Sequence, residues 1–203
     1  MQEGTGGQAV EGRKTVRQYR VIDLSLFCLI LVFFENLLVK AASAWFPGEP
    51  WSVSVTAAVT AIVMIRWGPW AAIHAFLGGA VYVLASGGSG QQLAVYALGN
   101  LACLAVLPLV RRWGWEKIRE NSWANFLYSF LVLLCMQAGR GIIAMLLGSR
   151  PLVALGFITT DVISYVFTMM IVWIVSKLDG MLEDQKHYLA RVNDPRNQKG
   201  GVR

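Results

Sequence analysis

Residues 52–84 read SVSVTAAVTAIVMIRWGPWAAIHAFLGGAVYVL and contain a single charged side chain, that of Arg66. The pair Gly68-Pro69 follows shortly after Arg66. Pro69 suits the first turn of a helix because its missing N–H would have no intrahelical partner there. The stretch therefore predicts two short apolar helices, 52–66 and 69–86, joined by a tight turn. A helix that crosses a bilayer needs about 20 mostly apolar residues, so both would be short spans.

The rest of the chain has the same apolar character. Of its 203 residues, 56% are hydrophobic and 15% are charged, whereas a soluble domain carries about a quarter charged residues. This composition excludes an ordinary soluble enzyme, a disordered protein and a secreted disulfide scaffold. Further apolar runs lie at 22–41, 92–110, 122–147 and 153–176. We therefore predict an all-α polytopic membrane domain of six transmembrane helices over residues 21–178, with tails at 1–20 and 179–203.

The basic residues indicate which way these helices run. With a cytoplasmic N-terminus, all of the 18 Lys and Arg except Lys40, Arg140 and Arg150 fall in cytoplasmic segments. Lys and Arg accumulate on the cytoplasmic side of membrane proteins, so we expect both termini to be cytoplasmic. The first apolar run also has features of a signal peptide, but polar side chains within 35–40 interrupt it, so we expect it to remain as a helix.

Several chemistries have no motif in this sequence. There is no G-x-x-x-x-G-K-[ST] segment for nucleotide phosphates and no H-E-x-x-H zinc segment. The two histidines, His74 and His187, fall in different compartments of the predicted map. We therefore expect no catalytic residue, no metal or cofactor, and no enzyme. The basic residues border the spans rather than form a patch, so membrane lipid is an expected contact and nucleic acid is not.

Polar side chains inside the predicted spans point to a binding site. An ionisable residue at the centre of a span costs about 2.5–3.5 kcal/mol and needs a partner, water or a ligand. In the predicted orientation these groups fall in the outer halves of four spans. We predict a pocket, open only to the outside, that binds a neutral or zwitterionic small molecule, with Trp45 and the 87–90 loop as a possible lid. Its candidate residues are Glu35, Asn36, Trp51, Tyr96, Asn100, Gln137, Arg140, Thr160 and Asp161.

Structural alternatives remain open for several of these groups. Arg140 could pair with Asp161 or Glu35 only to fix helix packing. Lys40 could extend to the outer headgroups. His74 could join two helices by a hydrogen bond.

Two further patterns concern helix faces. The polar residues Asp161, Ser164, Tyr165 and Thr168 share one face of the last span by helical spacing. Small residues recur on the second and third spans, at Ala57, Ala58, Ala61, Ala71, Ala75, Gly78 and Gly79. Such faces let membrane helices approach closely, either within the protein or against a partner.

In plan, residues 20–178 resemble the substrate-binding (S) components of energy-coupling factor (ECF) vitamin transporters of bacteria. The resemblance rests on the six spans, the short second span, the aromatic Trp67–Trp70 turn and the small-residue third span with its Gly-Gly pair. It implies a multi-pass protein of the bacterial cell membrane that captures a vitamin-like nutrient near the outer face. It also implies two kinds of partner, a transmembrane coupling subunit and two cytoplasmic ATPase subunits.

One departure from the family concerns how such a subunit would dock. The family's first helix carries an Ala-x-x-x-Ala motif, whereas residues 24–34 read LSLFCLILVFF. The alternative surface for docking on the coupling subunit is then the second or third span. The alternative function is a structural or assembly protein of the cell envelope that has the same helical plan and no ligand.

Overall fold

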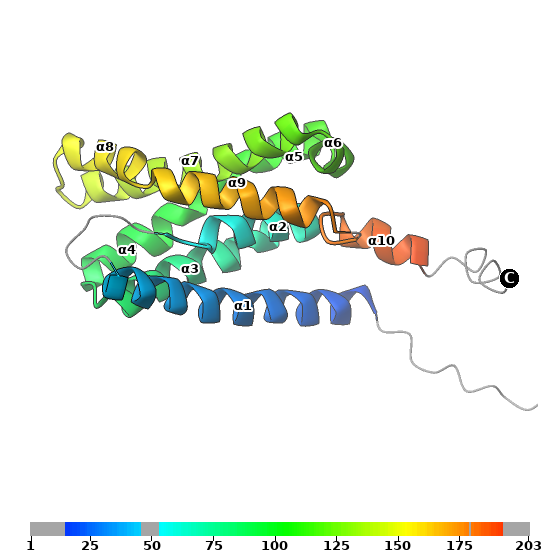
Figure 1. Cartoon of the computed structure of the whole chain (residues 1–203), viewed down its shortest axis with the longest axis horizontal. Coiled ribbons are helices and arrows are strands. Elements are labelled where there is room, and N and C mark those ends of the chain that lie inside the picture. Colours follow the sequence, from blue (N-terminus) through cyan, green and yellow to red (C-terminus); the bar gives the residue numbers. More distant parts are fainter. Residues whose placement is uncertain (1–14, 46–52, 179, 193–203) are drawn as a thin grey trace, which may run out of the picture.

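The computed structural model describes residues 15–45, 53–178 and 180–192, and the regular structure in them is helical. The helices run roughly along one long axis and form a bundle (Figure 1). Within these residues, the helical stretches long and apolar enough to cross a membrane are Val16–Trp45, Thr56–Ser86, Gly90–Trp113 and Ser122–Leu146. The all-α prediction is confirmed, and these four stretches are those expected of a multi-pass membrane protein.

The described elements follow one another along the bundle. In chain order they are α1 (Val16–Trp45), α2 (Thr56–Trp67), the 3-10 turn η1 (Gly68–Trp70), α3 (Ala71–Ser86), α4 (Gly90–Gly99), the 3-10 segment η2 (Asn100–Val106), α5 (Leu107–Trp113), α6 (Trp115–Glu120), α7 (Ser122–Leu146), α8 (Pro151–Thr160), α9 (Val162–Ser176) and α10 (Gln185–Val192). Figure 1 shows α10 at the end of the bundle where α1 begins, which we call the α10 end. The α3–α4 and α7–α8 connections lie at the opposite end.

The centre of the bundle is α2, in which every residue from Thr56 to Trp67 is buried. Its connection to α3 is the turn that the sequence predicts. Gly68 there has φ of 61°, a backbone conformation that glycine adopts without steric cost. Gly78 then lies directly against Thr56, because a Cβ added to this glycine would be 2.3 Å from the Thr56 hydroxyl oxygen. The apolar stretch Thr56–Ser86 is therefore folded as a helical hairpin.

The last predicted span is interrupted, whereas the fourth changes its helix type. The predicted helix 92–110 passes from α4 into the 3-10 segment η2 at Asn100 within the continuous helical stretch Gly90–Trp113, and the predicted helix 153–176 breaks at Asp161, between α8 and α9. The expectation of a continuous helix is wrong at Asp161. A break in a membrane helix is tolerated where protein surrounds the freed backbone groups. Asn100 and Asp161 are buried, at 0% and 7% exposure respectively, so the change of helix type and the break both lie inside the bundle.

Small residues allow the helices to approach closely. Gly79 lies against the backbone of Tyr96, so that an added Cβ would be 2.4 Å from the Tyr96 carbonyl oxygen. The small residues predicted on the second and third spans are all buried in the bundle. A second close crossing, which the sequence reasoning did not identify, joins Gly99 of α4 to Gly139 of α7.

We expect Gly139→Ala to destabilise the bundle by about 1–3 kcal/mol, the usual range for overpacking a well-filled core. The added Cβ would be 2.1 Å from the Gly99 carbonyl oxygen and 2.5 Å from the Cβ of Ala102, so the backbones must separate. The control is Gly156→Ala in α8, where the new Cβ would meet nothing within 4 Å. Thermal unfolding in detergent measures both. A lower midpoint for Gly156→Ala than for Gly139→Ala would contradict the close crossing.

The α10 end is held by a buried arginine. Arg66, at the end of α2, forms a bidentate ion pair with Asp23 of α1. Its Nε lies 2.9 Å from Asp23 Oδ2 and its Nη2 lies 2.8 Å from Asp23 Oδ1. Its Nη1 donates to the carbonyl oxygens of Gly180 and Met181, at 3.0 and 2.8 Å. This one side chain thus joins α1, α2 and the segment before α10.

The start of the C-terminal tail is packed against the bundle. Leu182, Glu183 and Leu189 are 0%, 2% and 6% exposed. The Glu183 carboxylate accepts from Arg191 at 3.0 Å and lies 3.7 Å from Arg119 of α6. Part of the predicted C-terminal tail is therefore buried against the bundle, whereas Lys186 and His187 are exposed.

Candidate functional site

Arg140 of α7 lies at the centre of a buried polar network. Its Nε donates to Asn100 Oδ1 at 2.8 Å, and its Nη1 donates to Gln137 Oε1 at 3.1 Å. The same Nη1 lies 3.6 Å from Asp161 Oδ2, which also accepts from Gln137 Nε2. Gln137 precedes Arg140 by three residues, the spacing at which helical side chains share a face. The network joins α7 to Asn100, where α4 passes into η2, and to Asp161, at the break between α8 and α9.

The network also reaches α3. The Asn100 side-chain amide donates to the Ala75 carbonyl oxygen at 3.0 Å while its oxygen accepts from Arg140. Ala75 is fully buried on the small-residue face of α3. An ion pair buried in this way is fixed by its hydrogen-bond partners, and removing one partner leaves an uncompensated charge.

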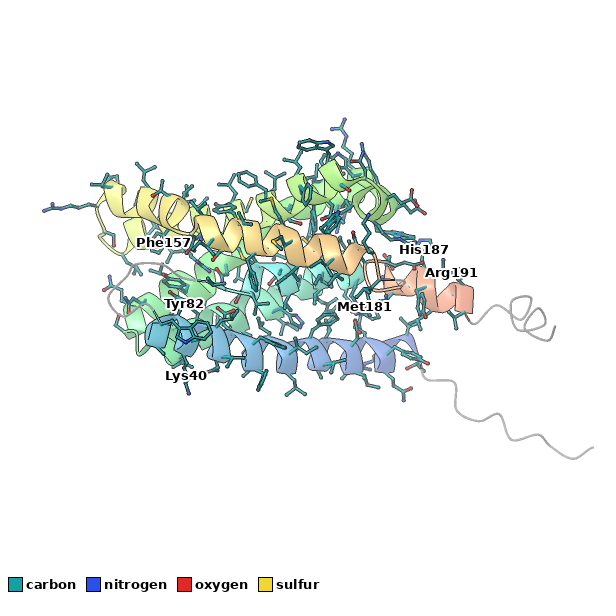
Figure 2. All side chains as sticks on the ribbon, viewed as in Figure 1. Lys40, Tyr82, Phe157, Met181, His187 and Arg191 are labelled. Carbon is teal, nitrogen blue, oxygen red and sulfur yellow. The ribbon has the colours of Figure 1, made fainter. Side chains whose placement is uncertain are left out.

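Three aromatic rings cover one side of this network. The Arg140 guanidinium lies 4.5 Å from the centre of the Tyr96 ring, a cation–π contact. The Tyr82 ring stacks on Tyr96 with centres 4.8 Å apart, and Phe157 of α8 meets Tyr96 edge-on at 5.8 Å. Tyr82 and Phe157 lie at the end of the bundle opposite His187 and Arg191 (Figure 2).

A cavity of 680 Å³ opens beside Tyr96 at this end of the molecule. It lies between the start of α4 and the α7–α8 connection, and its lining includes Ser89, Gln91, Gln92, Tyr96, Ser149 and Phe157. A cavity of about 300–1,000 Å³ has the size of a small-ligand pocket. Among the described residues, none of its lining side chains is charged.

The mouth of the cavity is held by local hydrogen bonds. Ser89 and Gln92 form a capping box at the start of α4, with Gln92 N donating to Ser89 Oγ at 3.3 Å and Ser89 N donating to Gln92 Oε1 at 2.8 Å. The Gln91 amide donates to the Leu147 carbonyl oxygen at 3.2 Å, which joins α4 to the end of α7. The wall is therefore pre-formed.

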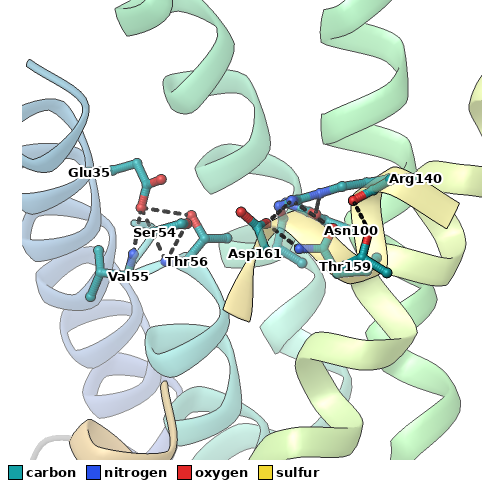
Figure 3. Close-up of polar contacts among 11 residues, drawn as sticks. Glu35, Ser54, Val55, Thr56, Asn100, Arg140, Thr159 and Asp161 are labelled. Carbon is teal, nitrogen blue, oxygen red and sulfur yellow. Dashed lines mark hydrogen bonds and ion pairs between the residues drawn. The ribbon is translucent and has the colours of Figure 1, made fainter. Parts of the chain in front are cut away.

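Glu35 belongs to a separate group, in which it caps α2 from the neighbouring helix. The residue before α2 is Val55, whose side chain has no polar atom for a cap. Glu35 Oε2 instead accepts from Val55 N at 3.0 Å, from Thr56 N at 3.1 Å and from the Thr56 hydroxyl at 3.0 Å. A carboxylate at a helix N-terminus is also favoured by the helix dipole. Figure 3 draws this group together with the Arg140 network.

The structure brings together five of the nine candidate residues, namely Tyr96, Asn100, Gln137, Arg140 and Asp161. Only Tyr96 of these lines the cavity. Asn36 is half-buried and donates to the Val32 carbonyl oxygen of its own helix. Trp51 and the side chain of Thr160 lie outside the described residues.

Other predictions about this region have mixed outcomes. The polar stripe on the last span is confirmed as one face, since Asp161, Ser164, Tyr165 and Thr168 are all buried. Ser89, from the loop considered as a lid, lines the cavity, whereas Trp45 is 77% exposed. His74 makes a hydrogen bond between helices, with Nε2 3.1 Å from the Leu24 carbonyl oxygen.

The sequence reasoning missed Tyr82, Gln91, Ser149 and Phe157. The available signal was their position near the outer ends of the predicted spans, beside the turns at 87–90 and 147–151. Within the described residues, no group of three or more His, Cys, Asp or Glu side chains could hold a metal ion. Comparisons of the chain with protein-family models, curated proteins and solved structures found no match.

Proposed function

We propose that this protein is a substrate-capture subunit of an ATP-driven importer of the ECF type in a bacterial cell membrane. The observation that carries the proposal is the pre-formed cavity beside Tyr96, next to a buried polar network at one end of an apolar bundle. In this proposal the chain crosses the membrane six times, the α10 end is cytoplasmic and the cavity opens outward. The α2–α3 hairpin supports six crossings, because it turns one long apolar stretch into two antiparallel helices.

The chemistry of the cavity suggests what it would hold. Tyr96 and Phe157 offer aromatic surfaces, while Ser89, Gln91 and Ser149 offer polar groups. With no charged side chain among the described lining residues, an uncharged or zwitterionic nutrient fits better than an ion, since an unpaired charge is costly to bury. No covalent chemistry is proposed. Arg140 would act through Tyr96, by holding the ring that forms the wall.

The energy for import would come from partner proteins. They are a transmembrane coupling subunit and two cytoplasmic ATPases, because this chain has no G-x-x-x-x-G-K-[ST] motif for binding ATP. We do not propose docking through the second span, since every residue of α2 is buried. An exposed apolar surface exists on α1, which includes Leu26, Leu29 and Phe33 at 53%, 70% and 64% exposure.

Co-purification from the native host in mild detergent tests the importer assignment. The affinity-tagged protein is expected to elute with a second polytopic membrane protein and with ATPase subunits that carry the G-x-x-x-x-G-K-[ST] motif. Elution without any ATPase, from membranes in which those subunits are present, would contradict the assignment.

The second candidate is a structural membrane protein without a ligand. The observation in its favour is that Arg140 already has Asn100, Gln137 and Asp161 as partners, so the network is satisfied within the chain. In that case the Tyr96 cavity would hold only water or lipid.

A further inference from the structure

A second cavity lies at the α10 end, far from Tyr96. Its volume is 350 Å³, and the residues used below, Trp67, Arg111, Trp115, Asp184, Lys186 and His187, are part of its lining. They come from the end of α2, the end of α5, the start of α6 and the start of α10. Figure 2 shows His187 at this end of the bundle, beside Arg191.

The walls of this cavity are fixed by buried contacts. Arg66, which also lines it, is held by Asp23 and by the carbonyl oxygens of Gly180 and Met181. Leu189 of α10 is 6% exposed, so α10 is anchored against the bundle. The start of α10 therefore presents Lys186 and His187 at a defined place.

Two basic groups of this cavity, Arg111 and Lys186, differ from the four arginines that form ion pairs among the described residues. Arg66 pairs with Asp23, Arg140 with Asp161, and Arg119 and Arg191 with Glu183. Neither Arg111 nor Lys186 has such a partner among the residues that the structure describes. Among the described lining residues the acidic one is Asp184, whose carboxylate accepts from the backbone N–H of Lys186 at 2.8 Å.

We propose that this cavity binds a phosphate group, carried either by an anionic phospholipid headgroup or by a soluble phosphate ester. Arg111 and Lys186 would form charge-assisted hydrogen bonds to the phosphate oxygens, which are among the stronger polar contacts in proteins. His187 adds a further ring nitrogen at the same wall. Trp67 and Trp115 suit a site at the depth of the headgroups, where tryptophan is enriched.

The experiment is native mass spectrometry of the detergent-purified protein, titrated with phosphatidylglycerol and, in a parallel series, with glycerol 3-phosphate. The test variant is Arg111→Gln/Lys186→Gln. The matched control, Arg112→Gln/Lys177→Gln, removes the same charge from exposed positions at the same end that do not line the cavity. All four side chains are exposed, so both variants should fold.

We expect the test variant to bind at least one ligand about tenfold more weakly than the unaltered protein, as loss of one or two charged hydrogen bonds implies. The control should stay within about twofold, since its charges act only through screened long-range attraction. Loss in the lipid series alone assigns the site to a headgroup, and loss in the glycerol 3-phosphate series assigns it to soluble esters as well. Equal weakening in test and control variants, or no weakening in either series, would overturn the proposal.

Discussion

Glu35→Ala is expected to lower the free energy of unfolding by about 3 kcal/mol, because it leaves buried donors at the start of α2 without an acceptor. The Val55 N–H and the Thr56 hydroxyl both donate to this carboxylate, and the carboxylate itself is fully buried. The substitution also removes a negative charge from a helix N-terminus, where it is favourable. Equilibrium unfolding in mixed micelles of mild detergent and SDS measures the loss.

Two controls make this result specific. Asn36→Ala removes the next side chain, whose amide donates to the Val32 carbonyl of its own helix, and should cost less than about 1 kcal/mol. Glu35→Gln keeps an acceptor oxygen and should lose less stability than Glu35→Ala. If Glu35→Ala unfolds at the same SDS fraction as Asn36→Ala, Glu35 does not cap α2.

The second large effect is expected at the Arg140–Asp161 ion pair. Removing one partner of a buried pair typically costs about 3–5 kcal/mol, since the other charge stays buried without compensation. Arg140→Ala and Asp161→Ala should each be destabilised in this range. The double variant should be less destabilised than the sum of the two, because it leaves neither charge behind. The same unfolding measurement gives all three values.

Arg150→Ala is the matched control for these variants. This arginine is exposed at the start of α8, so its removal should change stability by about 0.5 kcal/mol or less. Strict additivity of the Arg140 and Asp161 effects would show that the two side chains are not coupled. In that case the Arg140 network could not be said to hold the Tyr96 ring at the cavity wall.

The sequence predicted the hairpin turn and the gathering of polar side chains for clear physical reasons. Pro69 has no backbone N–H to continue the helix that precedes it, and Gly68 readily adopts the backbone conformations of a turn. A turn at Arg66–Trp70 follows. Charged residues inside apolar runs must find partners, so Arg140 and Asp161 were expected to lie in one cluster or to share a ligand. Their helical spacing with Gln137 and Ser164 further fixed which faces point inward.

Features that depend on contacts between distant segments could not be predicted from the sequence. The local signals for the change of helix type at Asn100 and the break at Asp161 are weak, since Gly99, Asn100 and Asp161 are unfavourable in a helix interior but do not by themselves end a helix. Glu35 was grouped with Arg140 because both lie at similar depth, whereas its partners are the backbone groups at the start of α2. The cavity was predicted among the charged residues, but the Tyr96 ring, on which Tyr82 stacks and which Phe157 meets edge-on, lies between the cavity and Arg140.

Small molecules released from the purified protein test the capture function most directly. Ser149→Trp should fill the cavity from its wall, whereas Ser86→Trp places the same ring at an exposed position at the same end, outside the lining residues. Mass spectrometry of the denatured samples should find one compound released in near-stoichiometric amount by the unaltered protein and by Ser86→Trp, and little of it from Ser149→Trp. If no such compound is found after purification from the native host, or if Ser149→Trp retains it as fully as Ser86→Trp, the cavity beside Tyr96 is not a capture site.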